Sequence, residues 1–180
     1  REIFQGALGV RVSASVPEEP GSCDDFLMKA DKNPNTLGAT LLGLAGPGAP
    51  EAGQIVEEAF AGKLDAGHWY ANQDESGGRV ISEGCHFLDY FCFLFGSRPV
   101  RVTAQSTWSA GGALPLPDSV TAQVEFADGS SGQLIYSAEG DTTYPKEHCT
   151  VYGAGIVADI TNFQSLTIHQ RNTRKKFKYG

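Results

Sequence analysis

The sequence has no apolar run long enough to cross a membrane as a helix, because the apolar stretch at residues 37–46 is short and interrupted by glycine. No basic segment followed by a hydrophobic run stands at its N-terminus, so no signal peptide is visible. Positive charge is also scarce, and the formal net charge of −7 argues against general nucleic-acid binding, which depends on neutralising phosphates. We therefore expect no membrane and no nucleic acid as partner.

Cysteine is infrequent and scattered. None of the four cysteines forms a Cys-x-x-Cys pair; they are Cys23, Cys85, Cys92 and Cys149. A structural zinc site uses ligands at closer spacing, so we expect no metal. We interpret the four as reduced, partly buried thiols of a cytoplasmic protein.

The composition is that of a folded protein, since 41% of the 180 residues are hydrophobic. This length suggests one domain, or one domain and a small appendage. We divide the chain into an N-terminal segment, residues 1–60, and an α/β domain, residues 61–180. In the N-terminal segment we expect a strand at 9–16, a short helix within 22–36, a Gly/Pro-rich linker at 46–50 and a helix at 50–61.

The segment from Gly77 to Gly96 has the pattern of one amphipathic helix. It follows a glycine turn and stops at Gly96, with Pro99 just beyond. At 100° per residue, one side of this helix collects apolar side chains that predict a core stripe. The members of the stripe are Phe87, Leu88, Phe91, Leu94 and Phe95.

His86 points away from this stripe. Its sector also holds Ser82, Glu83, Asp89 and Tyr90, because residues three and four apart are neighbours on a helix. An imidazole among carboxylates and hydroxyls suits proton transfer. A surface histidine with ordinary polar neighbours has the same spacing, so the pattern leaves both interpretations open.

An aromatic cluster, His68-Trp69-Tyr70, comes just before this helix. An aromatic face beside a ring hydrogen-bond donor suits a sugar, whose C–H face is apolar and whose rim carries hydroxyls. A packed tryptophan beside a surface histidine is the alternative interpretation.

After Gly96 the chain is rich in short strands, and Asp128-Gly129 predicts a hairpin turn. We predict an α+β fold, a largely antiparallel open sheet of six or seven strands with helices on one face. Five of the fourteen basic residues fall at 171–178, which we interpret as an edge strand whose lysines discourage further pairing. The expected strands are 100–108, 120–126, 134–136, 148–152, 156–160, 165–169 and 175–179.

The central helix resembles part of a known family, the glucose–fructose oxidoreductase / inositol dehydrogenase (Gfo/Idh/MocA) oxidoreductases, in their C-terminal half. It is most similar to a subgroup fused to alcohol-dehydrogenase-like halves. The resemblance continues through 126–130, 145–147 and 151–153, and so covers about residues 61–178. The matching residues of the helix are Gly77, Gly78, Arg79, Glu83, Cys85, His86, Phe87 and Asp89.

This resemblance implies the substrate-binding and oligomerising half of a NAD- or NADP-dependent sugar or polyol oxidoreductase, a homo-oligomer through its sheet. It implies that His86 accepts the proton when a secondary alcohol is oxidised, with Glu83 as a second catalytic residue. The implied substrate contacts are His68, Trp69, Arg79, Ser82, Asp89, Tyr90 and Lys146.

The sequence departs from the family in three respects. Ser82 stands where the family has an aspartate four residues before the histidine. Neither the Gly-x-Gly-x-x-Gly loop nor the Glu-Lys-Pro motif of the family's N-terminal half occurs, so NAD(P) would be bound mainly by a half absent from this chain, which alone should be inactive. The expected helix ending at Gly62 runs almost directly into the His68-Trp69 loop, whereas the family has a strand between them. A non-catalytic binding or assembly module that keeps the fold is the alternative function.

Overall fold

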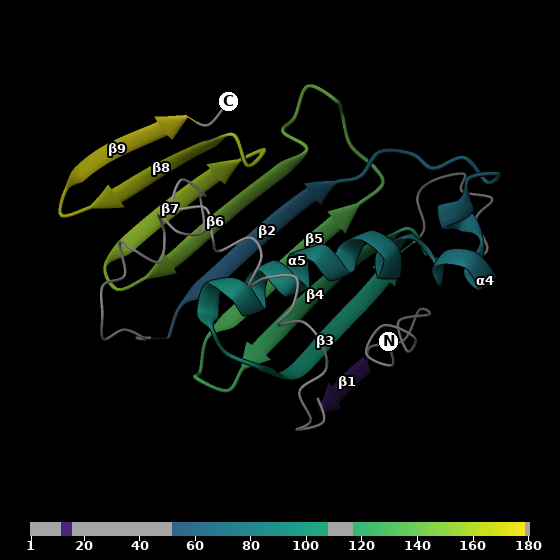
Figure 1. The fold of residues 1–180 in the computed structure, drawn as a ribbon, viewed down its shortest axis with the longest axis horizontal. Helices are drawn as coiled ribbons and strands as arrows, with labels where there is room; N and C mark the ends of the chain where they lie inside the picture. Colours follow the sequence, from purple (N-terminus) through teal and green to yellow (C-terminus); the bar gives the residue numbers. More distant parts are fainter. Residues whose placement is uncertain (1–11, 16–51, 108–116, 179–180) are drawn as a thin grey trace.

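The computed structural model describes residues 12–15, 52–107 and 117–178. One nine-stranded sheet dominates it, in the order β1-β3-β4-β5-β2-β6-β7-β8-β9, with helix α5 lying across one face (Figure 1). Its strands are β1 (Val12–Ser15), β2 (Gln54–Phe60), β3 (Pro99–Thr107), β4 (Ser119–Phe126), β5 (Ser131–Ser137), β6 (Glu147–Gly153), β7 (Ile156–Thr161), β8 (Ser165–Gln170) and β9 (Thr173–Lys178). Its helices are η1 (Trp69–Ala71), α4 (Gln73–Ser76) and α5 (Arg79–Phe95).

The predicted fold class is confirmed. All adjacent strands are antiparallel except β2 and β5, which are parallel. The sheet has more strands than the six or seven expected. The basic strand β9 is an edge strand, also as expected.

Strand β2 overturns the predicted helix at residues 50–61. It lies in the middle of the sheet, between β5 and β6, where Ile55, Glu57 and Ala59 are buried and alternate with less buried neighbours. A carboxylic acid at the central core position hides this alternation from sequence inspection. The strand that the family has before the His68-Trp69 loop is therefore present.

Other expectations for the N-terminal segment are only partly described. Residues Val12–Ser15 of the expected strand at 9–16 form β1, which pairs with β3. The expected helix within 22–36, the linker at 46–50, Cys23 and residues 109–116 of the loop after β3 lie outside the described residues. The division of the chain at residue 60 stays a prediction, although β2 belongs to the sheet.

Helix α5 packs on the sheet through its predicted stripe. Phe87 and Phe91 are buried, and the other stripe members are partly buried against the same core. The helix ends at Gly96, whose left-handed φ of 57° suits glycine. On β5, a Cβ added at Gly132 would lie 2.5 Å from the Phe91 ring, so glycine allows the close approach of helix and strand.

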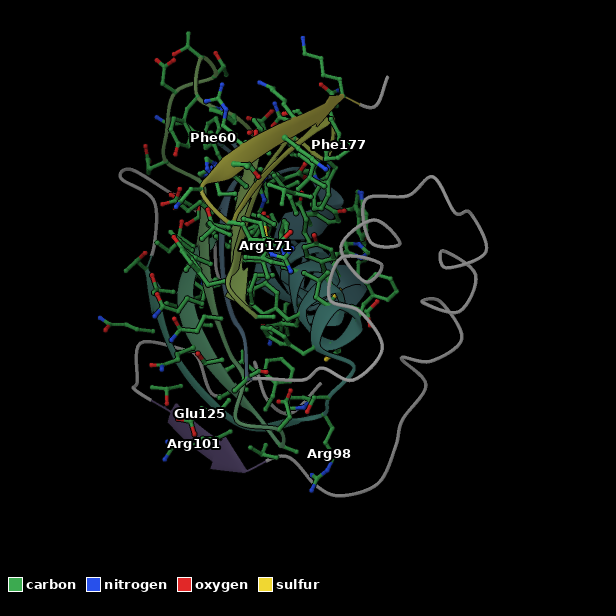
Figure 2. All side chains as sticks on the ribbon, turned by 90° about the vertical axis from the view of Figure 1, so that its left-hand side faces the viewer. Phe60, Arg98, Arg101, Glu125, Arg171 and Phe177 are labelled. Atoms are coloured by element: carbon green, nitrogen blue, oxygen red, sulfur yellow. The ribbon has the colours of Figure 1, made fainter. Side chains whose placement is uncertain are left out.

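The face of the sheet away from α5, which we call the open face, is mainly polar. Arg101 and Glu125 form an ion pair on this face, near the β1 edge (Figure 2). Large apolar side chains are exposed on it at Ile135 and Tyr152. Among the helices of the described residues, none is long and apolar enough to cross a membrane.

Candidate functional site

A buried hydrogen-bond network fixes Glu83, near the start of α5, to the sheet. The Tyr136 hydroxyl donates to Glu83 Oε2 over 2.6 Å, and Arg79 Nε donates to the Tyr136 oxygen over 2.7 Å. Arg79 Nε also lies 3.4 Å from Glu83 Oε2. Burial, with the bond to Glu83, raises the pKa of Tyr136, which therefore stays a donor. One oxygen of Glu83 is thus held in place, and the other is available.

Arg79 joins three parts of the chain. It is 6% exposed, and its two terminal nitrogens donate to the backbone oxygens of Ala61 and Gly62. The guanidinium carbon also lies 5.7 Å from the centre of the Tyr136 ring. Since these donors point inward, the described contacts of Arg79 anchor the loop after β2 to α5.

Lys146, in the loop before β6, approaches the available side of Glu83. Its Nζ lies 3.9 Å from Glu83 Oε1 and 3.5 Å from Glu147 Oε1, and its side chain is 61% exposed. The structure therefore brings together three of the predicted site residues, Arg79, Glu83 and Lys146. Sequence analysis missed Tyr136, although a buried tyrosine on a strand needs a partner for its hydroxyl.

The aromatic cluster His68-Trp69-Tyr70 is tied to the start of α5 through two serines. Ser82 Oγ donates to the Ser76 backbone oxygen over 2.8 Å, and Ser76 Oγ donates to the Tyr70 backbone oxygen over 3.1 Å. His68 Nδ1 accepts from the Tyr70 backbone N–H over 3.1 Å, so the proton of a neutral ring lies on Nε2. Trp69 is 52% exposed, and its ring centre lies 4.2 Å from that of Tyr70.

His86 is exposed, and Asp89 is half-buried. Two residues expected in the same sector, Glu83 and Tyr90, turn toward the sheet instead, and the Tyr90 hydroxyl is buried beside the Cys149 thiol. Both precede a stripe member by four positions, so they lie on the flank of the stripe and their long side chains reach inward. Along this flank, His86 lies between Glu83 and Tyr90.

A second polar cluster lies on the open face. His148 Nε2 is 2.9 Å from Asp159 Oδ2, and His148 Nδ1 is 3.4 Å from Glu58 Oε2. The Tyr144 hydroxyl donates to the same Glu58 oxygen over 3.1 Å. Partial burial lowers the pKa of His148, but the hydrogen bonds to both carboxylates outweigh it and raise the pKa overall. In the described part of the chain, no group of three or more His, Cys, Asp or Glu could hold a metal ion.

Comparison with known families decides where the chain belongs. Residues 53–156 match the family described as GFO/IDH/MocA C-terminal domain. The chain belongs to the Gfo/Idh/MocA family. It is a domain of the kind found in these oxidoreductases, sugar dehydrogenases among them. The narrower likeness to the subgroup fused to alcohol-dehydrogenase-like halves stays a prediction.

Solved structures share this fold. An aldose-aldose oxidoreductase from Caulobacter crescentus, complexed with glycerol, is 16% identical with a TM-score of 0.68, over 79% of this chain and 44% of that one. A levoglucosan dehydrogenase in complex with NADH and levoglucosan is 14% identical with a TM-score of 0.65, and the match covers 81% of this chain and 44% of that one. A UDP-N-acetylglucosamine 3-dehydrogenase from Acidithiobacillus ferrooxidans is 19% identical with a TM-score of 0.57, and the match covers 82% of this chain and 44% of that one.

At these identities the likeness establishes the fold alone. The chain spans less than half the length of these structures, with 44% of each covered. A comparison with curated proteins gave no match.

Proposed function

We propose that this chain is the substrate-binding and oligomerisation domain of a NAD- or NADP-dependent oxidoreductase that oxidises a secondary alcohol of a sugar or polyol. The observation that carries the proposal is the position of His86. It is exposed on a helix that the core holds firmly, between the fixed carboxylate of Glu83 and Tyr90, in a domain of an oxidoreductase family.

In this proposal the neutral imidazole of His86 accepts the proton of the substrate hydroxyl. A positioned proton acceptor contributes roughly 10²–10⁴-fold to a rate. Glu83, three residues earlier on the same flank, stabilises the imidazolium that forms and compensates for Ser82 at the family's aspartate position. Tyr136 and Arg79 position the Glu83 carboxylate.

We propose that the dinucleotide site lies mainly outside this domain. Such a site needs a strand, a glycine-rich loop and a helix in succession, whereas α5 follows helix α4 and the Gly-x-Gly-x-x-Gly motif is absent from the sequence. The nicotinamide, which accepts the hydride when bound, would thus be held mainly by another part of the enzyme. This domain supplies the groups that bind the alcohol and take its proton.

We assign two roles to the remaining site residues. Lys146, His68 and Trp69 are exposed and offer donors and an aromatic face, so we propose that they contact the sugar. Asp89, just under one helical turn after His86, would contact it as well. The side chains of Arg79, Ser82 and Tyr90 contact other parts of the protein, so we propose that they hold the site in shape and do not contact the sugar. Arg79 contacts the loop after β2, Tyr136 and Glu83, Ser82 contacts Ser76, and Tyr90 contacts Phe163.

We further propose that a second copy of the chain packs on the open face. Ile135 on β5 and Tyr152 on β6 are large apolar side chains that are exposed among polar ones, on opposite sides of β2, and packing against a second copy would remove both from water. A cytoplasmic location agrees with the free thiols of Cys85 and Cys149.

A non-catalytic binding or assembly module is the second candidate. Ser82 in place of the family's aspartate and the inward engagement of Glu83 favour it, because both reduce the groups available for chemistry. The two functions differ in one assay. The full-length protein is supplied with NAD⁺ or NADP⁺ and a panel of sugars and polyols, and formation of reduced nicotinamide is followed by absorbance. We expect reduction with at least one cyclic sugar, whereas sugar binding without reduction of either cofactor would favour the module.

A further inference from the structure

The turn between β7 and β8 holds a bulky residue in a conformation that favours glycine. In the β6–β7, β7–β8 and β8–β9 turns, two successive residues have positive φ. At the second of these positions the first and third turns have Gly155 (φ 70°) and Asn172 (φ 58°), which tolerate the left-handed region. The β7–β8 turn has Phe163 there, with φ 51°. For an aromatic residue this conformation is strained, and such strain gathers at functional sites.

Neighbouring contacts hold this turn in place. The Asn162 backbone N–H donates to the Glu147 backbone oxygen over 2.7 Å, and the Glu147 N–H donates back to Asn162 Oδ1 over 3.1 Å. The Gln164 N–H donates to the Thr161 oxygen over 3.0 Å and closes the turn. The turn is thus pinned to the first residue of β6, directly after Lys146.

The side chain of Phe163 extends to the flank of α5 that carries His86. Its ring meets the Tyr90 ring edge-on, with centres 5.4 Å apart and planes at 81°, yet the residue remains 36% exposed. Tyr90 is one helical turn after His86, and Glu83, which Lys146 approaches, is just under one turn before it. Two loops of the sheet therefore border this flank, with a cation beside Glu83 and an aromatic ring beside Tyr90.

We propose that Phe163 is a substrate-positioning residue, whose exposed ring stacks on the apolar C–H face of a pyranose while a hydroxyl of that ring faces His86. The inference rests on the proposed function and narrows its substrate to a cyclic sugar. Flat apolar rings match the C–H face of a pyranose, whereas an acyclic polyol presents no such face. The residue is 36% exposed, so the contact with Tyr90 does not bury it.

The test compares two substitutions in the full-length protein with nicotinamide bound. Phe163→Leu keeps an apolar side chain on Tyr90 and the same backbone strain but removes the flat ring. Asn172→Gly is the control, because it changes the corresponding position of the β8–β9 turn, away from α5. The probe is methyl β-D-glucopyranoside, measured by calorimetry and by saturation-transfer NMR. We expect the Kd of Phe163→Leu to rise roughly three- to tenfold, the size of an aromatic contact, with saturation lost mainly from the C–H face.

The other outcomes separate the two proposals. Unchanged affinity and an unchanged saturation pattern in Phe163→Leu would overturn the stacking role and leave the proposed function standing. If the wild type neither binds nor oxidises the glucoside but oxidises an acyclic polyol, the stacking role of Phe163 is wrong and the proposed oxidoreductase function stands. If the wild type oxidises no sugar or polyol, both proposals fail. Phe163→Gly, which relieves the strain, must reproduce the loss of affinity if Phe163→Leu folds poorly.

Discussion

Glu57 and Cys149 face each other across β2 and β6 on the sheet face that α5 covers. Glu57 is 0% exposed and Cys149 1% exposed, so the thiol is the polar group beside the buried carboxyl, and no nitrogen or oxygen of the described residues hydrogen-bonds either carboxyl oxygen. Burial raises the pKa of Glu57 from 4.5 to about 7, although the thiol and His148 lower it and Glu147 raises it. Burial also raises the pKa of the Cys149 thiol. Folding therefore retains a proton on Glu57 that the unfolded chain releases in weak acid.

This difference predicts that stability falls as pH rises. The folded state holds the proton up to about pH 7, whereas the unfolded chain releases it near pH 4.5, so the free energy of unfolding declines between these values. Glu57→Gln should be more stable than the wild type at about pH 8, by up to roughly 3 kcal/mol. The two proteins should be nearly equal in stability at about pH 4. Urea unfolding at both pH values measures the difference.

His148 needs a control in this experiment, because its raised pKa acts in the same direction. Its ion pairs with Asp159 and Glu58 contribute stability below the unfolded pKa, and this is lost as pH rises through the folded pKa. The His148→Gln background removes that contribution. If adding Glu57→Gln to this background left the pH dependence of stability unchanged, the buried carboxyl would not be its cause.

Glu57 also explains the main error in the sequence-based fold. The strands with regular alternation, such as Val120 to Phe126, and the hairpin at Asp128-Gly129 were predictable from local pattern. A central strand whose middle core position is an acid has no such pattern, and its parallel pairing with β5 depends on contacts distant in sequence. Composition could not reveal that burial raises the pKa of this acid to about 7.

A second prediction concerns the network at the start of α5. Tyr136→Phe removes the hydroxyl that joins Arg79 Nε to Glu83 Oε2 and leaves both groups partly unsatisfied. We expect a loss of roughly 1–3 kcal/mol in the free energy of unfolding. If Glu83 is a site residue, turnover per folded molecule should fall as well. Chemical denaturation and steady-state kinetics measure the two effects, and Tyr152→Phe on the open face is the matched control. Unchanged stability would contradict the network.

Binding of the cofactor gives a third prediction. Because no dinucleotide loop occurs in this sequence, the 180-residue chain alone should not bind NADH tightly. The full-length protein, as control, should bind it. Calorimetric titration tests both. Saturable binding of NADH to the chain alone at micromolar concentration would contradict the proposal that another part of the enzyme holds the cofactor.

Self-association gives a fourth prediction. If a second copy packs on the open face, Ile135→Glu places a charge in the contact and should convert an oligomer into monomers, as measured by sedimentation at tens of micromolar. Asn172→Glu adds the same charge in the β8–β9 turn and should leave the oligomer intact. If the wild-type chain sedimented as a monomer at this concentration, the proposed interface on the open face would be wrong.

The candidate site was less predictable than the fold. Helical spacing placed His86 away from the core and grouped it with Glu83, but it could not show that Glu83 and Tyr90 bend toward the sheet. Tyr136 and Phe163 come from β5 and from the β7–β8 turn, so only the tertiary structure brings them to α5.

The most direct test of the account is the turnover of His86→Ala in the full-length protein. His86 is exposed, so we expect the melting temperature to remain nearly unchanged, whereas turnover should fall roughly 10²-fold or more, the size of a lost general base. His169→Ala, at an exposed histidine of β8, should change neither quantity. A His86→Ala protein that is destabilised by about 1–3 kcal/mol but fully active per folded molecule would contradict the account, because His86 would then be structural.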